Sequence, residues 1–330
     1  MSKRRNGRGE RIRTSGLLVP NQALYQAEPR PDGVYTTFSF YRYPTHPATC
    51  DTISRSMNRR TLLQSIPAAL AAAPLASASK IDNSAGFRLG VATYSFRQFS
   101  RAEAIQMLKT LEIDSVSVKE MHAKIKSDPA EWAQARKDFE DAGIRIVSCG
   151  NITMVKDEDD DIEFNFKYAQ ALGATGIVMA PTVQTLPRIE KFVKKYNIKA
   201  MIHNHGPEDK HFPSPKSVYD AVKNMDPRMG LCIDIGHTVR TGTNVLEAIQ
   251  MAGPRLHDFH IKDLKNLSER DSQCEVGDGA IPVAAIFKLL KKVKYSGNTN
   301  LEYEINAKAP LPGMIKSFAY MRGVLAGMQS

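Results

Sequence analysis

The stretch GLCIDIGH at residues 230–237, followed by HDFHIKD at residues 257–263, carries the strongest signal for a fold. Each segment contains a short apolar run that reads as a buried strand, and each ends in groups able to bind a metal or transfer a proton. A buried charge without a partner is strongly unfavourable, so packing alone does not account for these strand ends. Charged groups at the C-terminal ends of strands are typical of catalytic sites in α/β barrels.

The same alternation of apolar and amphipathic runs continues through residues 79–330. Eight strands are predicted, at residues 89–95, 115–119, 145–149, 176–179, 199–203, 231–235, 256–261 and 300–305. Eight helices are predicted, at residues 102–111, 129–142, 162–172, 186–196, 215–224, 245–251, 281–293 and 314–325. This alternation indicates an α/β fold with a parallel sheet, and eight units over a length near ~250 residues favour a single (β/α)8 TIM barrel. No GxGxxG loop follows the first strand, which disfavours a dinucleotide-binding sheet.

Residues 57–78 read as a signal peptide of the twin-arginine type. A pair of arginines is followed by leucines, by an Ala-rich apolar run over residues 66–75, and by Ala-Ser-Ala at residues 76–78. The apolar run of about ten residues is shorter than the ~20 that a membrane-spanning helix needs, so no stable membrane anchor is expected. We expect cleavage near Ser79 and a protein that is exported, to the periplasm or the extracellular space.

Residues 1–56 show neither helical nor strand periodicity. Since a signal peptide stands at the N-terminus, we expect Met57 to be the true start and residues 1–56 to be a disordered upstream extension, with a long natural leader as the alternative.

Charge and cysteine content exclude two further classes. Of the net charge of +10, the first 60 residues contribute +7, from 11 Lys and Arg against 4 Asp and Glu, which leaves +3 for the remainder. So small a charge gives no indication of nucleic-acid binding. The four cysteines show no CxxC spacing, and one lies in the leader, so neither a zinc cluster nor a disulfide framework is expected.

Candidate functional residues cluster at the predicted strand ends. Six of the eight histidines, all but His46 and His211, are placed there. The ends contribute Lys119, Glu120 and His122 on strand two, His203 and His205 on strand five, Asp234 and His237 on strand six, His257, His260 and Lys262 on strand seven, and Glu302 and Glu304 on strand eight. His257 and His260 are an odd number of positions apart in one strand, so their side chains point to opposite faces of the sheet. His257 is therefore expected to point into the helix layer.

Four motifs in order, DIGH at 234–237, HIKD at 260–263, GDG at 277–279 and LEYE at 301–304, resemble those of a known family. The chain resembles the xylose isomerase-like barrels, the sugar phosphate isomerase and epimerase superfamily that includes inosose dehydratase and several sugar epimerases. The resemblance implies a divalent metal held by Asp234, His260 and Glu302. The family's Glu on strand four has no counterpart, because Met179 and Pro181 occupy its neighbourhood.

A histidine from strand five is expected to replace the missing carboxylate. His205 precedes a Gly-Pro turn that exposes it to the barrel mouth, so we expect it to be the fourth ligand, while His203 lies deeper and has a structural role. Under this hypothesis His205→Ala lowers metal content or turnover by at least ~10-fold, and His203→Ala mainly lowers stability. A site with two histidines suits Mn²⁺, Co²⁺, Zn²⁺ or Fe²⁺, with Mg²⁺ as the harder alternative.

The chemistry that these groups suit is isomerisation or epimerisation of a sugar. A metal stabilises the enediolate formed when a proton leaves the carbon next to a carbonyl, and a side chain of tuned pKa carries that proton. Candidate catalytic residues are Glu302, His237, Lys262 and Glu120, with His205 as a further partner for Glu302. The expected partner is a small-molecule sugar, and homo-oligomerisation is left open.

Two other functions stay open at this point. Export favours a lyase or dehydratase acting on keto-sugars or keto-glycosides, because phosphorylated sugars are scarce outside the cytoplasm and no phosphate cradle marks the mouth. A non-catalytic carbohydrate-binding barrel is the third hypothesis, suggested by the missing carboxylate on strand four.

Overall fold

The computed structural model describes residues 81–329. The predicted extension at residues 1–56, the signal peptide at residues 57–78 and the cleavage point near Ser79 lie outside the described residues.

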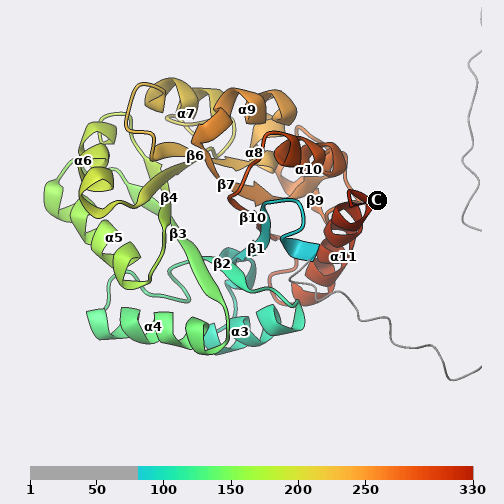
Figure 1. The fold of residues 1–330 in the computed structure, drawn as a ribbon, viewed down its shortest axis with the longest axis horizontal. Helices are drawn as coiled ribbons and strands as arrows, with labels where there is room; N and C mark the ends of the chain where they lie inside the picture. Colours follow the sequence, from blue (N-terminus) through green and yellow to red (C-terminus); the bar gives the residue numbers. More distant parts are fainter. Residues whose placement is uncertain (1–80, 330) are drawn as a thin grey trace, which may run out of the picture. The chain divides into compact units, whose positions relative to one another are not determined.

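Eight parallel strands close into a barrel with helices around it (Figure 1). In spatial order the strands are β1 (Arg88–Ala92), β10 (Asn298–Leu301), β7 (Leu256–Ile261), β6 (Met229–Asp234), β5 (Lys199–His203), β4 (Gly176–Pro181), β3 (Arg145–Met154) and β2 (Ser115–Val118). Every neighbouring pair is parallel, as a chain of right-handed β-α-β units requires. The predicted (β/α)8 barrel is confirmed.

The outer ring consists of amphipathic helices, one after each strand. They are α3 (Arg101–Thr110), α4 (Pro129–Asp141), α5 (Asp159–Ala171), α6 (Leu186–Tyr196), α7 (Pro215–Val222), α9 (Val245–Ala252), α10 (Val283–Lys292) and α11 (Leu311–Gly327). Capping residues fix where several helices begin. Ser100 and Ser214 form capping boxes at the N-termini of α3 and α7, and Asp128 caps α4, which begins with a proline. None of the described helices is long and apolar enough to cross a membrane.

Successive side chains of a strand point to opposite faces of the sheet, and this separates apolar from polar side chains. In β7, Phe259 and Ile261 belong to the apolar layer between sheet and helices, whereas Asp258 shares the parity of His260 and joins a buried polar network. The carboxylate of Asp258 accepts hydrogen bonds from Ser148 Oγ at 3.0 Å and Asn300 Nδ2 at 2.8 Å. A buried polar layer, in which Asn300 Oδ1 has no hydrogen-bond partner among the described residues, therefore lies next to the strand position that carries His260.

The structure differs from the predicted elements mainly at strand ends. The first strand ends at Ala92 and continues as a 3₁₀ helix, Thr93–Phe96, and the last ends at Leu301. After β6 the chain forms the short helix α8 (Ile235–Arg240), because the Asp234 carboxylate caps it by accepting from the His237 backbone N–H at 2.8 Å. A small antiparallel ladder, β8 (Asp263–Leu264) with β9 (Gln273–Cys274), was also not predicted.

Candidate metal centre

Four ligand-type side chains converge at the C-terminal mouth of the barrel. His203 ends β5, Asp234 ends β6, His260 is in β7, and Glu302 follows β10. One ligand atom from each lies within 4.8 Å of every other, and no more than 13% of any of these side chains is exposed. We call these four residues the metal group. Parallel strands bring their C-terminal ends to one face, so residues up to 99 positions apart meet here.

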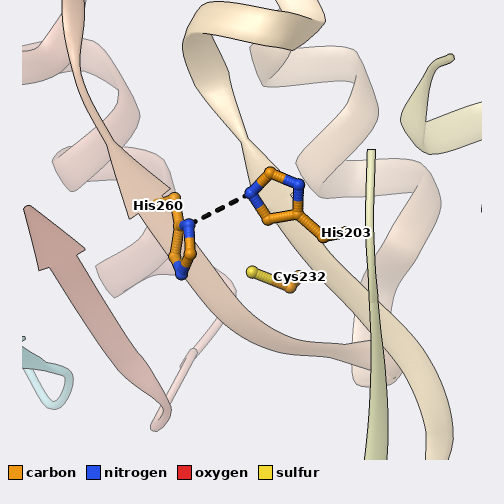
Figure 2. A group of neighbouring side chains, drawn as sticks. All are labelled: His203, Cys232 and His260. Carbon is orange, nitrogen blue, oxygen red and sulfur yellow. Dashed lines mark hydrogen bonds between the residues drawn. The ribbon is translucent and has the colours of Figure 1, made fainter. Parts of the chain in front are cut away.

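The two histidines of the metal group face each other. His203 Nε2 lies 3.1 Å from His260 Nδ1, the contact drawn as a dashed line in Figure 2, and Cys232 of β6 lies beside them. Burial lowers the pKa of His203 to about 3. Burial also acts to lower the pKa of His260, but Glu302, 3.4 Å away, outweighs it and raises that pKa. His203 is therefore the neutral partner, with a ring nitrogen available as a ligand.

Lys262 is the cation nearest to the carboxylates of the metal group. Its buried ammonium lies 3.0 Å from Asp234 Oδ2, 3.0 Å from Glu302 Oε2 and 2.6 Å from Glu304 Oε2. Burial acts to lower its pKa, but the three carboxylates outweigh burial and hold the pKa well above its usual value. Lys262 thus lies beside Asp234 and Glu302 of the metal group.

A polar side chain and a glycine hold Asp234 and Lys262 in place. Asn204 accepts from the backbone N–H of Asp234 at 3.1 Å and donates to Thr238 Oγ1 at 3.1 Å, which ties β6 to the start of α8. Gly236 leaves the path of the lysine open: a Cβ atom at this position would lie 2.6 Å from Lys262 Cδ. The DIGH motif thus combines a ligand, a helix cap and a space for Lys262.

The Asp of the HIKD motif orders the loop that supports Glu302. Asp263 accepts four backbone N–H hydrogen bonds, from Leu264, Gly277, Gly279 and Ile281, at 2.9 to 3.2 Å. At the β9 end of the same loop, Gln273 donates to the carbonyl oxygen of Glu302 and accepts from the N–H of Glu304, both at 3.0 Å. Asp263 and Gln273 therefore hold the backbone on both sides of Glu302. Sequence reasoning recognised the motif but gave these two residues no role.

The metal group opens into a cavity of about 500 Å³. The residues that line it all carry a polar or ionisable group: Tyr94, Lys119, Asn151, His203, His205, Glu208, Asp209, His237, Arg270, Glu302 and Glu304. Lys119 donates to the carbonyl oxygen of Asn151 at 3.0 Å, and burial lowers its pKa although Glu302 and Glu120 act in the opposite direction. A cavity of this volume and polarity accommodates a small polyol.

His205 lines this cavity outside the metal group. The chain leaves the sheet after His203. In the His205 ring, Nδ1 lies 3.1 Å from Asp209 Oδ2, and Nε2 lies 2.6 Å from Asn151 Nδ2. The geometry thus puts His203, rather than the expected His205, in the fourth ligand position. Both side chains share one parity, and the tertiary contacts with Asp209 and Asn151 decide between them.

The other predicted residues separate into two groups. His237 lines the cavity from α8, and its Nδ1 accepts from the Arg240 guanidinium at 3.2 Å. Glu120 is exposed on the loop after β2 and lines a neighbouring cavity instead. His257, as its parity predicted, does not join the metal group; its Nε2 contacts the Pro227 carbonyl oxygen at 3.0 Å, in the loop that leads into β6.

The donor set fits a divalent metal. Two imidazoles and two carboxylates form a mixed nitrogen and oxygen site of the kind that Zn²⁺, Mn²⁺, Co²⁺ and Fe²⁺ occupy. Asp234 Oδ2 is buried and accepts no hydrogen bond from the described residues; its neighbours are Lys262 and His203, the latter at 3.6 Å. β4 contributes no acidic residue, so His203 takes the place of a carboxylate. The cluster therefore offers four side chains that could bind one divalent metal ion.

Comparison with known proteins places the chain in a family. Residues 105–323 match the family model described as the xylose isomerase-like TIM barrel, and the chain belongs to this family. A comparison with curated proteins gives no match.

Solved structures share the fold. The chain is 25% identical to a putative uncharacterized protein from Parabacteroides distasonis, with a TM-score of 0.57 over 72% of this chain and 99% of that chain. It is 16% identical to the IolI protein with a bound zinc atom, with a TM-score of 0.62 over 72% and 98% of the two chains. It is 14% identical to the 3-keto-D-glucoside 4-epimerase YcjR from E. coli, with a TM-score of 0.60 over 72% and 99%.

Proposed function

We propose that this barrel is a metal-dependent sugar isomerase or epimerase that removes a proton from the carbon next to a carbonyl. The observation that carries the proposal is the convergence of His203, Asp234, His260 and Glu302 within 4.8 Å beside a polar cavity. Membership of the xylose isomerase-like family and structural likeness to an epimerase and to a zinc-containing barrel support it.

The metal group would hold a divalent cation, which would polarise the substrate carbonyl and stabilise the negative charge that develops on oxygen. Lys262, whose ammonium lies 3.0 Å from Asp234 Oδ2 and 3.0 Å from Glu302 Oε2, balances the charge of these two carboxylates. Because the guanidinium of Arg240 can only donate, His237 Nδ1 accepts, and the proton of the neutral ring is on Nε2. His237 can therefore donate a hydrogen bond to a substrate oxygen, and burial keeps its pKa below the usual value.

His205 is the residue that we assign to proton transfer. Asp209 is a carboxylate and accepts only, so the Nδ1 of His205 donates to it, and the lone pair on Nε2 accepts from Asn151 Nδ2 at 2.6 Å, a hydrogen bond that must break before Nε2 takes a proton from a substrate. Backbone N–H groups of His211 and Phe212 fix Asp209 in turn, at 2.8 and 3.0 Å. A base oriented by a carboxylate that is itself held by the backbone is a common arrangement for proton abstraction. Glu302 lines the same cavity and can serve as the second proton carrier.

The experiment combines metal analysis with isotope exchange. Protein expressed without the N-terminal 78 residues is loaded with Mn²⁺, Co²⁺, Zn²⁺, Fe²⁺ or Mg²⁺ and incubated with free ketoses, aldoses and 3-keto-glycosides in D₂O. Proton abstraction next to the carbonyl puts deuterium on that carbon, which NMR detects even when no net conversion occurs.

The outcomes separate the three functions. Deuterium uptake with an isomer or epimer as product supports the proposal. Release of an unsaturated sugar or an aglycone identifies a lyase instead. Metal binding without exchange in any of these compounds leaves a non-catalytic carbohydrate-binding barrel and overturns the proposal.

A further inference from the structure

A second cavity, which we call the side cavity, adjoins the candidate active site. Its volume is about 480 Å³, and its lining comprises Glu120, Lys124, Ile125, Lys126, Asn151, Ile152, Thr153, Val155, Lys156, Asp161, Phe164 and Asn165. Asn151 lines both cavities, and its Nδ2 lies 2.6 Å from the ring of His205. One side chain thus separates the side cavity from the residue that we assign to proton transfer.

The charged groups of the side cavity are available to a ligand. Lys124, Lys126 and Lys156 are exposed, and no ion pair is found for any of them in the described part of the chain. Glu120 and Asp161 on the same walls likewise have no cationic partner among residues 81–329. Five ionisable groups of both signs around one cavity offer hydrogen-bond donors and acceptors at no cost in broken ion pairs.

An apolar platform completes the side cavity. Phe164 is 37% exposed and Val155 55% exposed, although both are large hydrophobic side chains. The Phe164 ring is held in place by Trp132, with ring centroids 5.5 Å apart and planes at 69°. Trp132 is buried and donates through Nε1 to the carbonyl oxygens of Lys124 and Ile125, so it braces the wall from behind. An exposed aromatic ring kept rigid at low entropic cost is a good contact surface for the C–H face of a sugar.

We propose that the side cavity binds the second ring of a neutral two-ring glycoside whose reacting ring lies at the metal group. This inference rests on the proposed function and extends it, because it makes the substrate a glycoside or disaccharide rather than a free monosaccharide. An anionic group would be repelled by Glu120 and Asp161 and a cationic group by the three lysines, and a purely apolar group would leave five ionisable side chains without polar contacts. A polyol ring matches both the mixed charges and the Phe164 platform.

Trp132 provides a direct test, because it is the only tryptophan in the chain and touches the wall of the side cavity. Its fluorescence is followed while the metal-loaded protein is titrated with cellobiose, maltose, lactose and trehalose, and in parallel with glucose. We expect at least one disaccharide to shift or quench the emission, with an affinity at least ~10-fold higher than that of glucose. Calorimetry measures the same titrations independently.

Variants assign the signal to the side cavity. Phe164→Ala is expected to weaken disaccharide binding by ~10-fold while leaving the affinities for metal and glucose unchanged. Lys126→Ala combined with Lys156→Ala removes exposed lysines and leaves the core intact, so it tests the same wall without the risk of misfolding. Ile315→Ala, at a residue 48% exposed on α11, is the control and should change neither binding nor fluorescence.

The two proposals fail separately. If a disaccharide binds by calorimetry without a Trp132 response and without an effect of Phe164→Ala, the side cavity is not a sugar site, while the proposed function stands. Absence of binding by all four disaccharides also overturns the inference. If the protein binds no metal but a disaccharide still changes Trp132 emission, the side cavity is supported and the proposed function fails.

Discussion

The ammonium of Lys262 lies 3.0 Å from Oδ2 of Asp234, a member of the metal group. Both side chains are buried, and the same ammonium also contacts Glu302 at 3.0 Å. The lysine therefore neutralises the two carboxylates that a metal would use. It stabilises the protein without metal and, by repulsion, weakens the hold on a cation.

From this relationship we expect Lys262→Met to destabilise the metal-free protein by ~3–5 kcal/mol, because removal of one partner leaves buried charges uncompensated. Added Mn²⁺ or Zn²⁺ should recover much of this loss and should bind more tightly than to the parent protein. Urea unfolding with EDTA and with metal measures both effects. Lys216→Met, which removes an exposed pair with Asp220, should cost less than ~1 kcal/mol. Equal stability of the two variants would contradict the assigned role.

The roles of His203 and His205 predict opposite phenotypes. His203→Ala should lower metal affinity by ~10-fold or more, because it deletes a ligand, and should lower activity with it. His205→Gln should keep the metal content of the parent and lose deuterium exchange by ~100-fold or more, because it deletes the proton carrier. Metal analysis beside NMR exchange gives both numbers. Loss of metal from His205→Gln with full occupancy in His203→Ala would restore the assignment that the sequence suggested.

Two buried histidines away from the metal group predict acid sensitivity. Burial lowers the pKa of His122 and of His257 to about 4, against 6.5 for an exposed histidine. Between these pH values the unfolded chain binds protons that the folded chain does not. The contribution of these histidines to the free energy of unfolding is therefore complete above pH 6.5 and falls as the pH drops toward 4. Each residue contributes on the order of 3 kcal/mol to this loss.

Urea unfolding at pH 7, 6, 5 and about 4.5 measures the slope of the free energy of unfolding against pH. His122→Gln should flatten it, whereas His211→Gln, at an exposed position, should leave it unchanged. A parent protein with constant stability over this range would show that these histidines have the same pKa in the folded and the unfolded chain.

Asp263 predicts a coupling between the loop and the metal group. Asp263→Ala leaves four backbone N–H groups without their acceptor, and at ~1–3 kcal/mol for a buried unsatisfied group we expect a loss of ~3 kcal/mol or more. Because the loop holds Glu302 through Gln273, metal affinity should fall as well. Thermal unfolding and metal titration measure both. Asp278→Ala, in the same loop with an exposed carboxylate paired to Lys316, should have little effect on either. An unchanged metal affinity in Asp263→Ala would separate the loop from the site.

Much of the fold was predictable because its signals are local. Apolar runs of four to six residues, proline and capping residues at helix starts, and glycines after helix ends repeat along residues 81–329 in the order of a barrel. β5, β7 and α6 match their predicted bounds in full. Strand ends were less predictable. The apolar side chain of Ile235 indicates a strand, but Ile235 begins the helix α8, which the carboxylate of Asp234 caps.

The sequence by itself determined the alternation, the parity of the strands and therefore which polar side chains reach the barrel mouth, because each of these depends on near neighbours in the chain. Asp234, His260, Glu302 and Lys262 meet as their motifs predicted. Only the tertiary structure decided that His203 rather than His205 joins them, and that Glu120 lines a separate cavity. Those choices depend on Asn151, Asp209 and the path of the chain after each strand, and they come from contacts between segments far apart in sequence, whose distances no local pattern encodes.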